Sequence, residues 1–222
     1  MFDKLLHLPL FQGVTHEKLS ETVEKWPFHF LKYKRGEKII DRDDECTHVR
    51  FIISGRAKMT FESKKLKFAI SHELPSPDVV APDYLFGLAT RYPFTLRAVD
   101  ECGILQVAKN DYISMLQSDN VFLYNILNYL ARNSQMFKTQ MLGAEQVSLV
   151  ERLVMLVSAF TTQRSENIVL DFRQRDLCKI LGARRPALIS TLEDLTASGL
   201  IQVPSSSSII INDRKQLLDR VK

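Results

Sequence analysis

Residues 173–201 read RQRDLCKILGARRPALISTLEDLTASGLI, and this stretch decides the fold of the C-terminal part of the chain. In its first half, Leu177, Ile180 and Leu181 recur at helical spacing, which predicts a helix with one apolar face. Gly182 ends that helix, because glycine readily takes the left-handed conformation that a helix C-cap needs. The first half is therefore a short helix followed by a tight turn.

A second helix is predicted to begin at Pro186, since proline is favoured in a first helical turn, where its missing N–H would have no partner. Leu188, Leu192 and Leu195 continue an apolar face along this helix. Two short helices joined by a tight turn are typical of a helix-turn-helix, whose second helix enters the major groove of DNA. A plain helical hairpin with a solvated charge pair is the alternative interpretation.

The segment that follows extends the prediction to a winged helix. Residues 200–203 are predicted to form a short strand, residues 204–208 a serine-rich turn, and residues 209–211 a return strand. Asn212 or Asp213 can then cap a short final helix. The serine-rich tip of this hairpin is a candidate for contact with phosphate.

Length and composition are those of an ordinary globular protein. The 222 residues suffice for one large domain or two smaller ones, and the shares of hydrophobic and charged residues, 45% and 25%, are usual for soluble domains. No apolar run approaches the roughly 18 residues of a membrane span. The opening segment MFDKLLHLPLF is too broken by charge and proline for a secretory signal. We therefore expect a cytoplasmic protein with no membrane partner.

Charge and cysteine placement agree with this expectation. The net charge is +4, and residues 146–222 carry 11 Lys and Arg against 8 Asp and Glu, so most of the excess lies with the candidate DNA-binding segment. Cys46, Cys102 and Cys178 are far apart and form no C-x-x-C pair. This favours buried, reduced thiols over a disulfide framework or a zinc site, and we predict no metal.

The N-terminal half has a different sequence pattern, in which short apolar segments alternate with residues typical of turns. After short helices within residues 3–25, the strand signals run from Phe28 to about Val107. Residues 49–53, for example, predict a strand that ends at a Ser-Gly turn. Many short strands with regular turns are typical of a β-sandwich or barrel.

A long helix is predicted for residues 118–142, with two apolar faces. Phe122, Ile126 and Tyr129 form one face, which can pack on the β domain. The other face is a heptad seam, which we interpret as a parallel dimer contact; one wide core face is the alternative. The seam consists of Leu123, Leu127, Leu130, Ser134, Phe137 and Met141.

Over its whole length the chain resembles the family of the cyclic-AMP receptor protein and the fumarate–nitrate regulator. The supporting motifs are the helix-turn-helix, YKRGEKIIDRDDECTHVRFIISGRAKM at 33–59 and LRAVDECGILQVAKNDYISML at 96–116. The resemblance implies an α+β fold: an N-terminal double-stranded β-helix (a β-roll, cyclic-nucleotide-binding-like), a long dimerisation helix and a C-terminal winged helix-turn-helix. The expected domains are residues 1–117, 118–143 and 146–222.

The resemblance also assigns roles at the DNA interface. Arg185 matches the arginine that pairs with a guanine edge, and its forked guanidinium can meet O6 and N7 together. Pro186 stands where the cyclic-AMP receptor protein has a cytosine-reading glutamate, and Ser190 stands where it has a second arginine, so a different operator is expected. Gln174 and Arg175 resemble phosphate contacts. The expected DNA-binding residues are Arg173, Gln174, Arg175, Arg184, Arg185, Ser190 and Thr191.

The sensor motif departs from the family. Members that bind cyclic AMP have a Gly-Glu-Leu turn for the ribose and an Arg-Ser pair for the phosphate, whereas this chain has residues 86–88, Phe-Gly-Leu, and Tyr92-Pro93. Arg91 is one position off, which turns a strand side chain to the opposite face. We expect no cofactor and no regulatory cyclic-AMP binding. The alternatives are a pocket filled by its own side chains or one for another effector, lined by Phe86, Leu88, Arg91, Phe94 and Arg97.

Taken together, these features predict a sequence-specific transcription regulator that binds double-stranded DNA as a homodimer on a near-palindromic operator. The family resemblance adds RNA polymerase as a candidate partner. The sequence contains no glycine-rich phosphate loop, nucleophile elbow or metal-ligand spacing, so an enzyme is not predicted. The alternative function is a cyclic-nucleotide-binding-like module that acts on a partner protein without touching DNA.

Overall fold

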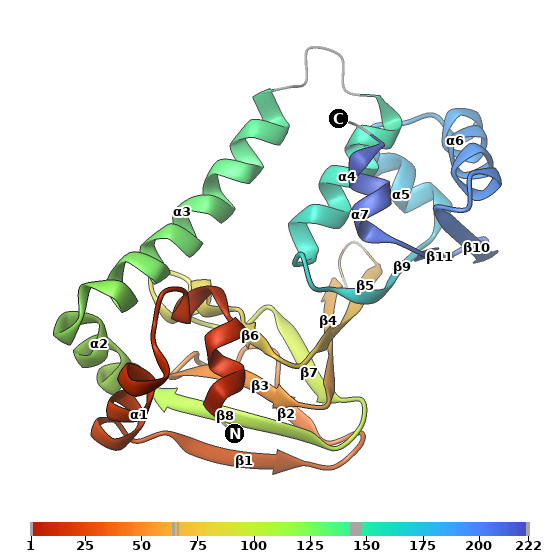
Figure 1. Cartoon of the computed structure of the whole chain (residues 1–222). Coiled ribbons are helices and arrows are strands. Elements are labelled where there is room, and N and C mark those ends of the chain that lie inside the picture. Colours follow the sequence, from red (N-terminus) through yellow and green to blue (C-terminus); the bar gives the residue numbers. More distant parts are fainter. Residues whose placement is uncertain (1, 64, 66, 143–147, 221–222) are drawn as a thin grey trace. The chain divides into compact units, whose positions relative to one another are not determined.

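The computed structural model describes residues 2–63, 65, 67–142 and 148–220, with side chains left out for 136–142. The chain divides into two compact units (Figure 1). The N-terminal unit contains Met1–Ala57 and Leu74–Met136, and the C-terminal unit contains Lys58–Glu73 and Phe137–Lys222. The predicted junction between 143 and 146 lies outside the described residues.

The N-terminal unit is built on short antiparallel strands, as predicted. One sheet has the order β1-β8-β3-β6, and β2 pairs antiparallel with β7 at the end of a second sheet. In the central strand β8, Ile104 and Leu105 are both buried although they point to opposite faces, so both faces of that strand are covered. The strands are β1 (His29–Tyr33), β2 (Lys38–Ile40), β3 (His48–Ser54), β6 (Asp78–Val80), β7 (Phe94–Ala98) and β8 (Cys102–Ala108).

Helices cover this β-roll. The ring of Phe11 meets Phe51 of β3 at 5.5 Å and Phe122 of α3 at 5.8 Å, so it joins the helices to the sheet. No helix among the described residues is both long enough and apolar enough to span a membrane. The helices are η1 (Phe2–His7), η2 (Pro9–Phe11), α1 (His16–Lys25), η3 (Pro82–Leu85), α2 (Lys109–Ser118) and α3 (Asn120–Leu142).

Helix α3 has the two faces that the sequence predicts. Phe122 and Ile126 are buried, which confirms the face that packs on the β-roll. On the heptad seam, Leu127 is 51% exposed and Ser134 is exposed, while Leu123 and Leu130 are half-buried. The described residues of α3 therefore do not form one wide core face. Phe137 and Met141 of the predicted seam lie outside the residues whose side chains are described.

The C-terminal unit contains the predicted helix-turn-helix. Gly182 has φ +60° at the C-cap of α5, and Leu188, Leu192 and Leu195 are buried on α6, as expected. The prediction for Ile180 is wrong, because this side chain is 38% exposed. Only Leu177 and Leu181, one turn apart, lie on the buried face of so short a helix. The helices are α4 (Leu149–Phe160), α5 (Gln174–Leu181), α6 (Arg185–Ala197) and α7 (Arg214–Asp219).

The wing is present and belongs to a larger sheet, of order β10-β11-β9-β5-β4 in this unit. Pro204 lies inside β10 and not in the turn, which is tighter than predicted. Asp213 caps α7 by accepting a hydrogen bond from the amide of Gln216 at 2.9 Å. The strands are β4 (Arg56–Ser63), β5 (Phe68–Pro75), β9 (Glu166–Phe172), β10 (Ile201–Ser205) and β11 (Ser208–Ile211).

Strand β5 comes from the middle of the sensor sequence, yet it pairs antiparallel with β9, Phe68 opposite Phe172 (Figure 1). The rings of these two residues stack at 4.9 Å, and Phe160 of α4 lies 6.1 Å from Phe68. Ile70 is fully buried in the core of the helix-turn-helix unit. The β4–β5 hairpin, residues 58–73, is therefore an integral part of the C-terminal unit.

Candidate nucleic-acid interface

Helix α5 begins where strand β9 ends, which places a run of cationic residues at the start of the helix. Arg173 is its N-cap, and the backbone carbonyl of Arg173 accepts from the amides of Asp176 and Leu177 at 2.8 and 3.0 Å. Gln174 and Arg175 occupy the first turn. The N–H groups of a first helical turn have no intrahelical partners and carry the positive end of the helix dipole, so these side chains lie at a helix end that itself attracts anions.

A side chain of helix α4 stabilises the turn between α5 and α6. The Nη1 atom of Arg152 donates to the carbonyl oxygens of Leu181 and Gly182, at 2.6 and 3.1 Å. These carbonyls end helix α5, where a positive charge is favourable. The contact fixes the start of α6, with Arg184 at the N-cap and Arg185 as the first helical residue.

The tip of the wing is tied to the end of β9. The amide of Phe172 donates to the carbonyl of Ser207 at 2.9 Å, and Ser208 pairs with Asp171. The serine-rich tip is therefore held next to Arg173, the residue that follows Phe172. Ser206 and Ser207 form the exposed end of the hairpin.

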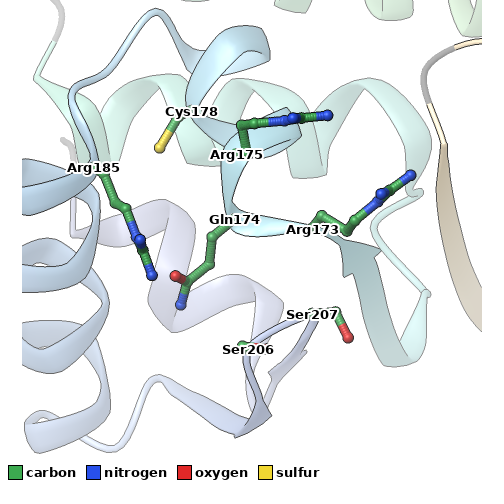
Figure 2. A pocket seen from close by; sticks show the side chains of 7 residues that line it. All are labelled: Arg173, Gln174, Arg175, Cys178, Arg185, Ser206 and Ser207. Carbon is green, nitrogen blue, oxygen red and sulfur yellow. The ribbon is translucent and has the colours of Figure 1, made fainter.

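Together α5, α6 and the wing enclose a hollow of about 450 Å³ (Figure 2). The side chains of Gln174 and Arg185 point toward one another, whereas those of Arg173 and Arg175 extend away from this pair. A concave surface with three arginines suits a polyanion. It is lined by Arg173, Gln174, Arg175, Cys178, Arg185, Ser206 and Ser207.

Four of the seven predicted DNA-binding residues thus line one hollow. The other three lie on α6 outside its lining: Arg184 and Ser190 are exposed and Thr191 is half-buried. Sequence reasoning missed Cys178, although its position one helical turn after Gln174 places it on the same face of α5. Ser206 and Ser207 belong to the serine-rich tip that was predicted as a candidate for phosphate contact, although neither was singled out as a DNA-binding residue.

In the β-roll, Tyr92 is buried and stands at the sequence position where family members that bind cyclic AMP have the first residue of their Arg-Ser pair. The hydroxyl of Tyr92 donates to Sγ of Cys46 at 2.8 Å and accepts from Nη1 of Arg50 at 3.0 Å. Burial raises the pKa of the Tyr92 hydroxyl and of the Cys46 thiol, so both groups are neutral at pH 7. The ring of Phe94 lies 5.2 Å from that of Tyr92 and is equally buried.

The structure does not gather the five residues expected to line an effector pocket. Phe94 is buried and Phe86 half-buried, but Leu88 is fully exposed to solvent. Arg91 and Arg97 are exposed, and each donates to a backbone carbonyl, that of Asp43 at 2.7 Å and that of Gly36 at 3.2 Å respectively. Among the described residues, no group of three or more His, Cys, Asp or Glu side chains could hold a metal ion.

Comparisons with known proteins agree with this architecture. Two family models match: a cyclic nucleotide-binding domain at residues 30–119 and a Crp-like helix-turn-helix domain at residues 148–220. The catabolite activator protein of Thermus thermophilus is similar in structure, with TM-score 0.54 and 15% identity over 96% of this chain and 100% of that one. A transcriptional regulator from Thermotoga maritima has TM-score 0.50 and 18% identity over 58% of this chain and 98% of its own. No curated protein matches the sequence.

Proposed function

This chain belongs to the family of the cyclic-AMP receptor protein and the fumarate–nitrate regulator, and is a DNA-binding transcription regulator of that type; we propose that it binds a near-palindromic operator as a homodimer. The hollow between α5, α6 and the wing carries the proposal, because it combines three arginines with a helix N-terminus. Arg185 is assigned to a base edge, and Arg173 and Arg175 to phosphates. RNA polymerase is a further proposed partner.

The exposed seam of α3 supports the homodimer. Leu127 of the seam is 51% exposed and Tyr124, which lies beside the seam, is 63% exposed, and large exposed apolar side chains at helical spacing are typical of an interface. A parallel pair of α3 helices would give the assembly two recognition helices. Their half-sites on DNA would then lie ~34–36 Å apart, one helical turn.

Selection of bound duplexes from a random DNA library, with the full-length protein, tests the proposal. We expect enrichment of an inverted repeat whose half-sites are centred about 10 base pairs apart. Sedimentation of the complex should give two chains per duplex. Failure to enrich any sequence would contradict specific DNA binding, and an asymmetric single site bound by one chain would contradict the dimer.

We further propose that the β-roll does not bind cyclic AMP. Arg50 already donates to Tyr92, and Tyr92, which stands at the sequence position of the family's Arg-Ser pair, is buried and hydrogen-bonded to Cys46. A buried cyclic phosphate would lack its charged partner, and the ribose hydroxyls would lack the carboxylate that family members supply. Each loss costs a few kcal/mol, which together move a micromolar site to the millimolar range or beyond.

Isothermal titration of the full chain with cyclic AMP, and separately with cyclic GMP, tests this second point. We expect no heat of binding at ligand concentrations up to about 0.1 mM. A dissociation constant of tens of micromolar or tighter for either nucleotide would contradict the proposal.

A further inference from the structure

Asp176 lies in the first turn of α5, between the two arginines assigned to phosphate. Its Oδ2 atom is 3.4 Å from Nε of Arg173, and its Oδ1 atom is 3.8 Å from Nε of Arg175. The Asp176 side chain is only 15% exposed, against 52% and 75% for the two arginines. A mostly buried carboxylate is therefore the shared neighbour of two cationic side chains that reach into solvent.

The placement of Asp176 needs a compensating interaction. Its Oδ2 atom is buried and accepts no hydrogen bond from the part of the chain that the structure describes. A buried carboxylate oxygen is unfavourable unless cations lie close to it. The positive end of the helix helps any acid in a first turn, but it does not require arginines on both sides. The two arginines supply the compensation, and in return the carboxylate restrains them.

The atoms that make these contacts decide what the arginines can still do. Both approach Asp176 through Nε, which carries one of the five N–H donors of a guanidinium. The other four donors, on the two terminal nitrogens, remain for an external anion. Figure 2 shows Arg173 and Arg175 extending in the same direction from α5, with their nitrogens at the far ends. Such a fork matches two oxygens of one phosphate.

We propose that Asp176 is a positioning residue, which holds the guanidinium groups of Arg173 and Arg175 in the orientation that contacts the DNA backbone. The inference rests on the proposed function, since it assumes that this surface meets DNA. The effect expected for Asp176 is opposite to the simplest electrostatic expectation. Removal of a negative charge from a DNA-binding surface should on electrostatic grounds strengthen binding, whereas removal of Asp176 should weaken it.

The test measures affinity for a 40-base-pair duplex of mixed sequence as a function of salt, because phosphate contacts do not depend on the operator. Asp176→Asn keeps the shape and removes the charge. We expect binding about 3- to 10-fold weaker than wild type, and a salt slope smaller by about 1 to 2 for the lost phosphate contacts. Asp194→Asn on α6 is the matched control, since Asp194 is an exposed carboxylate outside the hollow. It should bind as tightly as wild type or more tightly.

A purely structural role for Asp176 would lower thermal stability and leave the salt slope of the folded protein unchanged. The variant Arg173→Lys plus Arg175→Lys gives an independent reading, because it keeps both charges and loses both Nε donors. We expect its salt slope to fall as in Asp176→Asn. Unchanged affinity and slope in this variant would overturn the inference, even if Asp176→Asn failed to fold.

Two more outcomes are decisive. If Asp176→Asn weakens binding equally when Arg173 and Arg175 are both alanine, Asp176 does not act through them and the inference is wrong. If Asp176→Asn behaves like Asp194→Asn, it is also wrong, while the proposed function stands. Only a wild-type protein that binds no duplex would remove the proposed function and the inference together.

Discussion

Arg185 is the first residue of α6, and its side chain reaches into the hollow beside that of Gln174. From this position a bidentate contact to one guanine is expected. Arg185→Ala should therefore cost ~1–3 kcal/mol on the selected operator and relax the preference at one base pair of each half-site. Competition gel shifts with operators altered at single positions measure both quantities.

Arg175→Ala is the companion variant, since this arginine is assigned to a phosphate and not to a base. It should weaken binding to all duplexes alike and reduce the salt slope by about 1. If Arg185→Ala left affinity and base preference intact, the docking of α6 in the major groove would be wrong.

His72 on β5 predicts acid sensitivity of the C-terminal unit. Burial, with a smaller contribution from the charge of Arg214, lowers the pKa of His72 to about 4, and the ring is only 1% exposed. Between pH 6.5 and pH 4, His72 is protonated in the unfolded chain but stays neutral in the folded chain. Stability is therefore fully present above pH 6.5 and falls as the pH drops toward 4, by up to about 1.4 kcal/mol per unit.

Urea unfolding followed by circular dichroism at pH 7 and pH 5 measures this effect. The wild type should lose roughly 2 kcal/mol more between these pH values than His72→Leu does. His29→Gln, a change at an exposed histidine, should keep the wild-type pH dependence. Equal losses in wild type and His72→Leu would show that His72 is not the titrating group.

Local signals explain which elements the sequence predicts. Helices α5 and α6 follow from apolar spacing, Gly182 and Pro186, all of which act within a few residues. Strand β9 was missed, although Ile168, Leu170 and Phe172 alternate as buried strand residues do. Its role becomes clear only from its partners, because β9 pairs with β11 and β5, and no sequence window contains all three.

The β4–β5 hairpin is the element whose contribution is most readily tested. Phe68→Ala removes a ring that stacks on Phe172 and approaches Phe160, so we expect the C-terminal unit to lose about 2–4 kcal/mol of unfolding free energy. Hydrogen exchange of the β9 amides should report the loss. Lys65→Ala changes an exposed residue of the same hairpin and should stay within about 0.5 kcal/mol. Similar exchange in the two variants would contradict the packing role of Phe68.

For the molecule as a whole, the order of β-roll, long helix and winged helix follows from the sequence, whereas the state of the sensor does not. The missing motif residues near Gly87 predict loss of the nucleotide site. They could not predict that Tyr92, Cys46 and Arg50 bond to one another in the β-roll, since Tyr92 is more than 40 residues from the other two in the sequence. The sequence could not predict the exposure of Leu88 either, because apolar character alone does not determine whether a side chain is buried.

If α3 forms the dimer contact, a single substitution in its seam should change the oligomeric state. Leu127→Asp should yield monomers in sedimentation, because it would place a charge in the seam, and operator affinity should fall with it. Leu127 is already half-exposed in one chain, so the monomer should remain folded. Asn128→Asp introduces the same charge at an exposed position off the seam and should stay dimeric. A wild-type protein that is monomeric at micromolar concentration would contradict the seam.

The borrowed strand β5 has a consequence for chimeric regulators. A fusion that transplants only residues 146–222 onto another sensor would leave one side of β9 without its partner and would remove Ile70 from the core. An unpaired strand edge recruits other chains, so such a fusion should aggregate. The unit to be transplanted is discontinuous in sequence, because residues 58–73 must be transferred together with the winged helix-turn-helix. The sensor protein that receives it must therefore accept a foreign hairpin within the sequence of its own β-roll.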